Sequence, residues 1–288
     1  LALHEGVPAE QILCGNGAAD LIFRLVWAKK PRRALVTAPT FAEYATALES
    51  IGCMVKRFFL REQEDFAVTD AFCAAIRPGV DMVFLCQPNN PTGQLTTLPL
   101  VEQIFRRCAA CGTLLVVDEC FLDFLPDHAL HTAKGLLGEG DLVILKAFTK
   151  LYGMAGVRLG YALSADTALL EQMQACGQPW GVSSLAQAAG LAALEETAYV
   201  EKVRALIAEQ RPRLTAGLRA LGLRVLDGRA NYLLFQAPET LGEALRQRGA
   251  VLRSCANYPG LGPGWYRTAV RTGPENEQLL KLLAEVLE

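Results

Sequence analysis

The sequence predicts an α/β protein with a large domain built on a mainly parallel sheet, followed by a smaller α+β domain. Two patterns indicate this. Through the first half of the chain, short β-branched runs alternate with helical segments, which is typical of a parallel sheet covered by helices. Beyond residue 183 an Ala-, Leu- and Glu-rich helical stretch, and then short strands, replace the alternation. We therefore assign residues 1–182 to the large domain and 183–288 to the small domain, with the boundary inside segment 177–184.

The elements follow from these patterns. In the large domain we expect strands at 33–38, 53–58, 81–86, 113–118 and 141–146. Helices are expected at 19–30, 41–52, 68–79 and 98–112, several ending at Gly as helix C-termini often do. In the small domain we expect a helical region from 183 that Pro212 breaks or kinks. Strands within 223–228, 231–236, 250–254 and 265–271 follow it, with helices at 239–248 and 275–287.

Composition excludes several classes of function. The 28 Lys and Arg residues nearly balance the 30 Asp and Glu residues, leaving a net charge of −2. Nucleic-acid binding needs a basic patch or stripe, and an anionic membrane surface attracts a polybasic segment, so we expect neither partner. No apolar run is long enough to span a membrane. The chain starts at Leu1 with neither a Met nor a signal peptide, and we expect its true start to lie before that residue.

The cysteines indicate a reducing compartment. There are nine, an odd number, in mostly apolar surroundings, which favours buried reduced thiols in a cytoplasmic protein. The Cys108–Cys111 spacing resembles that of metal or redox sites, but it falls in an amphipathic helix without a second such pair. His128 and His131 have no plausible third ligand nearby. We expect no metal site.

Polar residues follow several of the expected strands or precede a helix. In open α/β sheets, ligands bind outside the carboxyl ends of the strands. The turn Gly15-Asn16-Gly17 precedes a helix whose N-terminus could hold a phosphate. Asn90 lies in "QPNNPTG" after strand 81–86, and Asp118 ends a very apolar strand. Taken singly, each has a simpler explanation: a tight turn, a proline-fixed turn, or an ordinary ion pair.

The stretch "LVILKAFTKLYGMAGVRLGYAL", residues 142–163, carries three cations in apolar surroundings. Long cationic side chains can rest their stems on apolar surface. Alternatively, one lysine lies in a dry pocket and acts as a nucleophile. Lys150 comes just after strand 141–146, with Thr149 beside it and Arg158 further on, whereas Lys146 lies within the strand and is expected to be structural.

Together these groups match one cofactor. A phosphate cradle, an amide for a ring hydroxyl, a carboxylate for a ring N–H and an amine nucleophile are what pyridoxal 5′-phosphate (PLP) requires, and the Schiff-base lysine with an Asp partner is its signature. The order of GNG, NNPTG, DE, TK and RLGY resembles the fold type I PLP enzymes of aminotransferase class I and II. "GRANYLLF" and the C-terminal "LRSCANYPGL…YRTAVR…NE" resemble the threonine-phosphate decarboxylases of cobalamin biosynthesis, which are close to the histidinol-phosphate aminotransferases.

The resemblance implies a reaction. It is the PLP-dependent decarboxylation of L-threonine O-3-phosphate to (R)-1-aminopropan-2-yl phosphate. The alternative is a PLP-dependent aminotransferase acting on histidinol phosphate or a similar phosphorylated amino compound. Phe121 stands three residues after Asp118, where the aminotransferases usually have Tyr, and this moves the balance toward decarboxylation. The resemblance also implies a homodimer, with an N-terminal arm that precedes Leu1 and reaches the neighbouring subunit's cofactor.

Residue roles follow from the resemblance in the same way. Lys150 would carry the cofactor, Asp118 would pair with its ring nitrogen and Asn90 with its ring hydroxyl, next to the substrate. Either Phe41 or Tyr44 would stack on the ring. The cofactor phosphate would be held by Gly17, Ala18, Thr149 and Arg158. Arg267 would bind the substrate carboxylate, which leaves Arg253, and with it Arg271, for the substrate phosphate.

Overall fold

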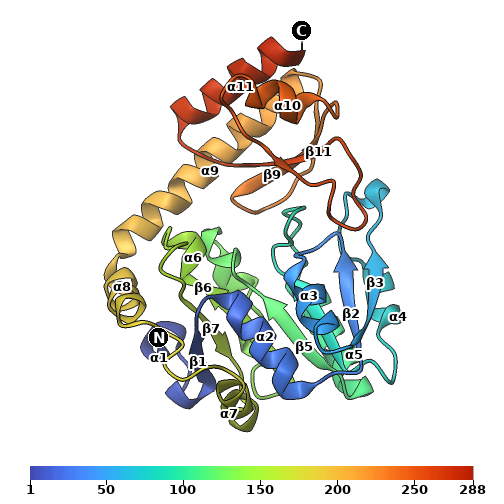
Figure 1. The fold of residues 1–288 in the computed structure, drawn as a ribbon, viewed down its shortest axis with the longest axis vertical. Helices are drawn as coiled ribbons and strands as arrows, with labels where there is room; N and C mark the ends of the chain where they lie inside the picture. Colours follow the sequence, from blue (N-terminus) through green and yellow to red (C-terminus); the bar gives the residue numbers. More distant parts are fainter. Residues whose placement is uncertain (288) are drawn as a thin grey trace.

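The computed structural model describes residues 1–287, and a seven-stranded sheet forms the centre of its larger part (Figure 1). The strands lie in the order β1-β7-β6-β5-β4-β2-β3. All neighbours are parallel except β7, which runs antiparallel to both β1 and β6. The carboxyl ends of β2, β4, β5 and β6 therefore meet at one edge. The strands are β1 Ile12–Gly15, β2 Arg33–Ala38, β3 Met54–Phe59, β4 Met82–Cys86, β5 Leu114–Asp118, β6 Leu142–Ala147 and β7 Gly160–Leu163.

Helices cover both faces of this sheet. Because side chains alternate along a strand, Leu114 and Val116 pack toward α2, α3 and α7, whereas Leu115 and Val117 pack toward α4, α5 and α8. The helices are α1 Ala2–Glu5, α2 Ala18–Lys29, α3 Glu43–Glu49, α4 Asp70–Ala75, α5 Leu98–Cys111, α6 Phe148–Leu151, α7 Thr167–Ala175 and α8 Ser184–Glu195. Short 3₁₀ turns lie at Ala9–Gln11, Glu62–Glu64, Leu122–Phe124, His128–Leu130 and Ala133–Leu136.

A second, four-stranded antiparallel sheet with its own apolar core forms the smaller part. Its strands, in the order β10-β11-β9-β8, are β8 Arg224–Val225, β9 Tyr232–Gln236, β10 Arg253–Ser254 and β11 Trp265–Ala269. Its helices are α9 Thr197–Ala220, α10 Leu241–Arg246 and α11 Gly273–Leu287. Figure 1 shows α9 running from the side of the large sheet up to this smaller part.

The helical region after residue 183 differs from the expectation at two points. The break falls at Glu196, between α8 and α9, while α9 continues through Pro212, so the predicted break at Pro212 is wrong. Ile207 and Leu214 are buried on either side of Pro212, and their packing stabilises both halves of the helix. A kink at Pro212 stays a prediction. Ala186 and Ala193 of α8 pack into the core of the large sheet. The domain boundary at residue 183 stays a prediction.

Within residues 1–287, no helix is long and apolar enough to cross a membrane. The same residues hold no group of three or more His, Cys, Asp or Glu side chains placed to bind a metal ion. All nine cysteines are free, and Cys108 is buried in α5, where it packs against the sheet.

Candidate active site

A cavity of about 180 Å³ opens where the carboxyl ends of β4, β5 and β6 meet the first turn of α2. Its position follows from the parallel pairing, because Cys86 and Asp118 end β4 and β5 as register partners, and Leu145, the partner of Asp118, lies two residues before the end of β6. Seven residues predicted to bind the cofactor line it: Ala18, Phe41, Asn90, Asp118, Thr149, Lys150 and Arg158. Phe121, which the sequence also singled out, lines it as well.

Asp118 is held in one orientation at the floor of this cavity. It is 5% exposed; its Oδ2 accepts a hydrogen bond of 2.5 Å from the Tyr44 hydroxyl, and its Oδ1 accepts one of 3.0 Å from the backbone N–H of Cys120. Burial, together with the charge of Asp118, raises the pKa of Tyr44, so this phenol keeps its proton and donates it.

This arrangement corrects the expectation for Tyr44. The ring is fully buried and stacks on Phe84 at 4.7 Å, behind Asp118, so it does not face the cavity. Phe41 does line the cavity, and its ring meets Tyr44 edge-on at 5.5 Å. Of the two aromatic candidates for ring stacking, only Phe41 is placed for that role.

The two lysines of β6 and α6 face different surroundings. Lys146 is 5% exposed and ion-paired with Asp123 at 2.9 Å and Glu5 at 3.5 Å. Burial alone would lower the pKa of Lys146, but Asp123, Glu119 and Glu5 raise it above its usual value. This lysine stays protonated and cannot act as a nucleophile. Lys150 is exposed, its Nζ lying 5.4 Å from the centre of the Phe121 ring. The dry lysine is thus Lys146, and Lys150 is the one a ligand can reach.

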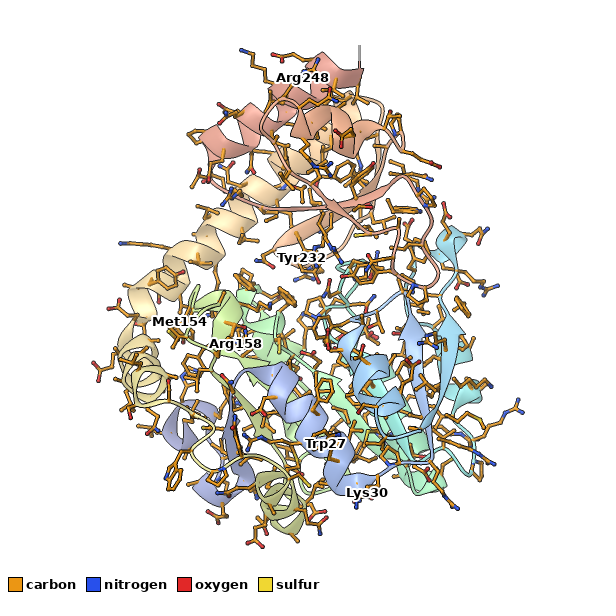
Figure 2. The ribbon with its side chains drawn as sticks, in the orientation of Figure 1. Trp27, Lys30, Met154, Arg158, Tyr232 and Arg248 are labelled. Atoms are coloured by element: carbon orange, nitrogen blue, oxygen red, sulfur yellow. The ribbon has the colours of Figure 1, made fainter. Side chains whose placement is uncertain are left out.

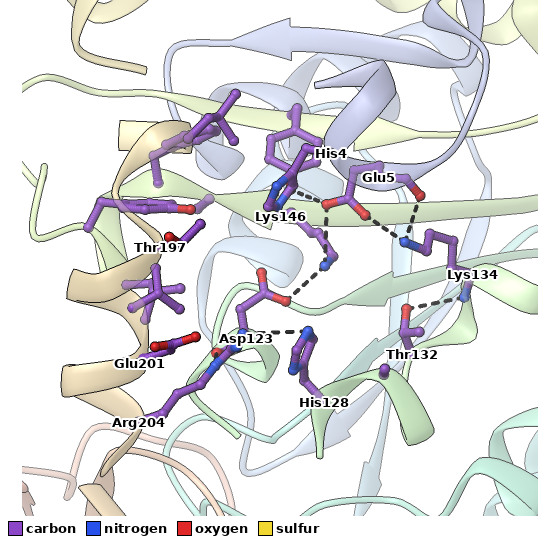
Figure 3. A pocket seen from close by; sticks show the side chains of 18 residues that line it. His4, Glu5, Asp123, His128, Thr132, Lys134, Lys146, Thr197, Glu201 and Arg204 are labelled. Carbon is purple, nitrogen blue, oxygen red and sulfur yellow. Dashed lines mark hydrogen bonds and ion pairs between the residues drawn. The ribbon is translucent and has the colours of Figure 1, made fainter. Parts of the chain in front are cut away.

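The Lys146 side chain points into a second cavity, of about 380 Å³, behind the strand (Figure 3). Phe148 and Leu151 of α6 face this cavity, whereas Thr149 and Lys150 face the first one. Its charges are largely paired among themselves; Lys134, for example, lies 3.0 Å from Glu5. We therefore assign the second cavity a structural ion-pair cluster, and the chemistry to the first.

The N-terminus of α2 forms the anionic end of the first cavity. Gly17 has a φ of +84°, which favours glycine. A Cβ on Gly160 of the neighbouring β7 would lie 2.6 Å from the N atom of Ala18, so this glycine lets the turn approach the strand. The Arg158 guanidinium lies against the turn, with Nη2 3.5 Å from the Asn16 carbonyl oxygen. Free N–H groups of a helix beside a guanidinium suit a phosphate.

One arginine of the smaller sheet contacts a residue of the cavity, and a second lies beside it on the neighbouring strand. Arg267 donates a hydrogen bond to Oδ1 of Asn90, and Arg253 is its cross-strand partner, so both project from one face. Arg253 donates to Oδ1 of Asn257 at 3.3 Å. Both guanidiniums are thus bonded to neutral amides, and two neighbouring cations of this kind favour a ligand with two anionic groups.

The expectation for Arg271 needs correction. This residue follows the end of β11, its side chain is 66% exposed, and it lies 3.4 Å from Glu275 on its own segment. The pairing of β10 with β11 brings Arg253, and not Arg271, beside Arg267.

The side chains present fit PLP. The cavity holds an amine, a fixed carboxylate and an amide from three adjacent strand ends, and a glycine-lined helix N-terminus with a guanidinium closes its far end. Cys86 and Cys120 also line the cavity, although no role is predicted for them from the sequence. Each lies within two residues of a strand end, the signal that identified Asp118. Tyr232, which contacts Arg267, lies in the segment "GRANYLLF" and has no predicted role from the sequence.

Comparisons with known proteins agree with this geometry. Residues 3–286 match the family model "Aminotransferase class I and II". The chain is 40% identical over 291 aligned residues to a threonine-phosphate decarboxylase of Salmonella typhimurium, covering all of this chain and 80% of that protein. It is 32% identical to a histidinol-phosphate aminotransferase of Nitratidesulfovibrio vulgaris, covering 100% of this chain and 78% of that protein. A crystal structure of the histidinol-phosphate aminotransferase from Clostridium acetobutylicum matches 99% of this chain and 86% of that one, with a TM-score of 0.92 and 25% identity.

Proposed function

The chain belongs to the aminotransferase class I and II family of PLP enzymes, and we propose that it decarboxylates L-threonine O-3-phosphate to (R)-1-aminopropan-2-yl phosphate, a step of cobalamin biosynthesis. The observation that carries this proposal is the 40% identity to a threonine-phosphate decarboxylase across the whole chain. The paired Arg253 and Arg267 fit this substrate, because it has both a phosphate and a carboxylate.

The residues of the first cavity have distinct tasks in this proposal. Bound PLP supplies an electron sink for the electrons of a broken bond at the substrate Cα. Lys150 would hold the cofactor, and the Asp118 carboxylate, fixed by Tyr44, would keep a proton on its ring nitrogen. Asn90 would meet the ring hydroxyl. The N-terminus of α2, with Thr149 and Arg158, would hold the cofactor phosphate.

The arginines decide which bond breaks. We assign the substrate carboxylate to Arg267, which already contacts Asn90 at the cavity, and the substrate phosphate to its strand neighbour Arg253. The Cα–carboxylate bond then breaks, CO₂ leaves, and a proton takes its place on Cα. Lys150 is the amine on the cavity that can carry this proton. If the Cα–H bond breaks and the carboxylate stays, the reaction becomes transamination, the alternative.

The assembly and location are proposed on separate grounds. We propose a homodimer, as the family resemblance implies, and closed two-fold dimers are the most common soluble oligomers. We propose a cytoplasmic location because all nine cysteines are free, as expected in a reducing compartment.

The reaction is tested by supplying the purified protein with PLP and L-threonine O-3-phosphate and measuring CO₂ release. Histidinol phosphate with 2-oxoglutarate, followed by glutamate detection, tests the alternative. Lys150→Ala removes the proposed nucleophile and should abolish CO₂ release. Glutamate formation without CO₂ would replace the proposal by the aminotransferase.

A further inference from the structure

Tyr232 contacts three parts of the candidate active site. It is the first residue of β9, is 4% exposed, and lies at the edge of the smaller part that faces the larger one (Figure 2). The Arg267 guanidinium lies over its ring, with Cζ 5.0 Å from the ring centre. Its hydroxyl donates a 2.9 Å hydrogen bond to the Asn89 carbonyl oxygen, and its ring meets Phe121 edge-on at 5.1 Å.

These contacts hold Tyr232 at its hydroxyl and at its ring. The hydroxyl is anchored to the turn that carries Asn90, and Phe121, which also lies near Lys150, packs against the ring. A second bond joins the same turn to the smaller part, because the Arg229 N–H donates to the Gly93 carbonyl oxygen at 2.6 Å. The guanidinium of Arg267 therefore rests on a surface that is itself held against the cofactor side of the cavity.

We propose that Tyr232 is a positioning residue that fixes Arg267 for the carboxylate of the substrate, an inference that rests on the proposed function. A cation over an aromatic face is held electrostatically, and a guanidinium held in place before the ligand arrives loses less conformational freedom on binding. Tyr232 does not touch the substrate in this role. It acts through Arg267, so its contribution is confined to ligands that carry a carboxylate.

The test compares two ligands that differ only by that group. Calorimetry on the PLP-loaded protein in a Lys150→Ala background, which blocks turnover, gives the affinity for L-threonine O-3-phosphate and for 1-aminopropan-2-yl phosphate. Tyr232→Leu removes the ring and should weaken the first ligand about tenfold while leaving the second within about twofold. Tyr232→Phe keeps the ring but loses its anchor, and should weaken the first ligand about threefold. With Lys150 intact, the same variants should raise KM more than they lower kcat.

Tyr266 supplies the matched control. It lies on the strand that carries Arg267, is 4% exposed, and its hydroxyl donates to the Glu239 carbonyl oxygen at 2.7 Å in the core of the smaller part. Tyr266→Leu should lower the unfolding temperature and leave the ratio of the two affinities unchanged.

The outcomes separate this inference from the proposed function. An equal loss for both ligands in Tyr232→Leu and Tyr232→Phe, or no loss for either, would overturn the positioning role. Absence of CO₂ release by the wild-type protein would overturn the proposed function, and the ratio of the two affinities would still decide the role of Tyr232.

Discussion

The Tyr44 hydroxyl donates a 2.5 Å hydrogen bond to Oδ2 of Asp118, and both side chains are buried beneath the cavity. The pair joins two distant segments of the chain, because Tyr44 comes from α3 and Asp118 from the end of β5. A carboxylate in this position needs partners, since an unpaired buried charge is costly. Tyr44 therefore sets where the negative charge of the site lies.

Replacing Tyr44 by Phe should weaken both the fold and the cofactor site. Loss of a hydrogen bond to a buried carboxylate should lower the free energy of unfolding by about 2 kcal/mol, and a less well-fixed Asp118 should weaken PLP binding about tenfold. Urea denaturation and quenching of protein fluorescence by PLP measure the two effects. Tyr266→Phe loses a buried hydroxyl that bonds the Glu239 carbonyl oxygen in the core of the smaller part, and should change stability alone. Unchanged PLP binding in Tyr44→Phe would contradict the positioning of Asp118 by this phenol.

The two lysines should separate stability from chemistry. Lys146→Met leaves Glu5 and Asp123 without their buried partner and should lower the free energy of unfolding by about 3–5 kcal/mol. Lys150→Ala removes an exposed side chain and should change the free energy of unfolding by less than about 0.5 kcal/mol. Borohydride reduction of the PLP-loaded protein, followed by peptide mass analysis, should locate the cofactor on Lys150. A cofactor label on Lys146 would reverse the assignment.

The contact between the two parts of the chain gives a third prediction. A Cβ on Gly228 would lie 2.7 Å from the backbone C atom of Gly93, in the turn that carries Asn90, so Gly228→Ala must shift that turn. The overpacking should lower the free energy of unfolding by about 1–3 kcal/mol, and the displaced turn should lower kcat/KM about tenfold. Gly262→Ala is the control, because a Cβ there meets nothing within 4 Å. Equal kcat/KM values for the two variants would exclude a role of this contact in activity.

Much of the fold could be predicted, because the central strands are long apolar runs. Strand 33–38 has the predicted bounds, and the other four expected strands of the large domain are shifted or shortened by a residue at an end. β1 and β7 were not predicted. Each has only four residues and includes a glycine, Gly15 or Gly160, so neither resembles a strand by composition. They become strands through pairing with each other and with β6.

The residues of the cavity were predictable for a topological reason, since parallel strands end at a common edge. Two assignments that the sequence left open, the stacking aromatic and the second arginine, depend on tertiary contacts. Phe41 precedes α3 and Tyr44 lies within it, and only packing of α3 on the sheet decides which ring is buried behind Asp118. The choice between Arg253 and Arg271 depends likewise on the register of β10 against β11.

The ion-pair cluster of Glu5, Asp123, Lys134 and Lys146 predicts how the stability of the fold depends on pH. Burial opposes the charged form of Glu5, but Lys146, Tyr161 and Lys134 outweigh it and lower the pKa of this carboxyl to about 2, from 4.5. Below 4.5 the unfolded chain binds a proton at this position that the folded chain does not, so stability falls as the pH falls from 4.5 toward 2. The contribution, fully present above that window, is on the order of 3 kcal/mol.

Glu5→Gln should remove the contribution of the Glu5 carboxylate to stability at neutral pH. The free energy of unfolding should then fall less steeply as the pH drops below 4.5. Urea denaturation at a series of pH values measures both effects. Glu10→Gln, at an exposed glutamate of the same N-terminal region, should behave like the wild-type chain. A Glu5→Gln protein that kept the wild-type slope would show that the acid sensitivity comes from other carboxylates. In that case Lys146 would depend chiefly on Asp123, its nearer partner at 2.9 Å, for its compensating charge.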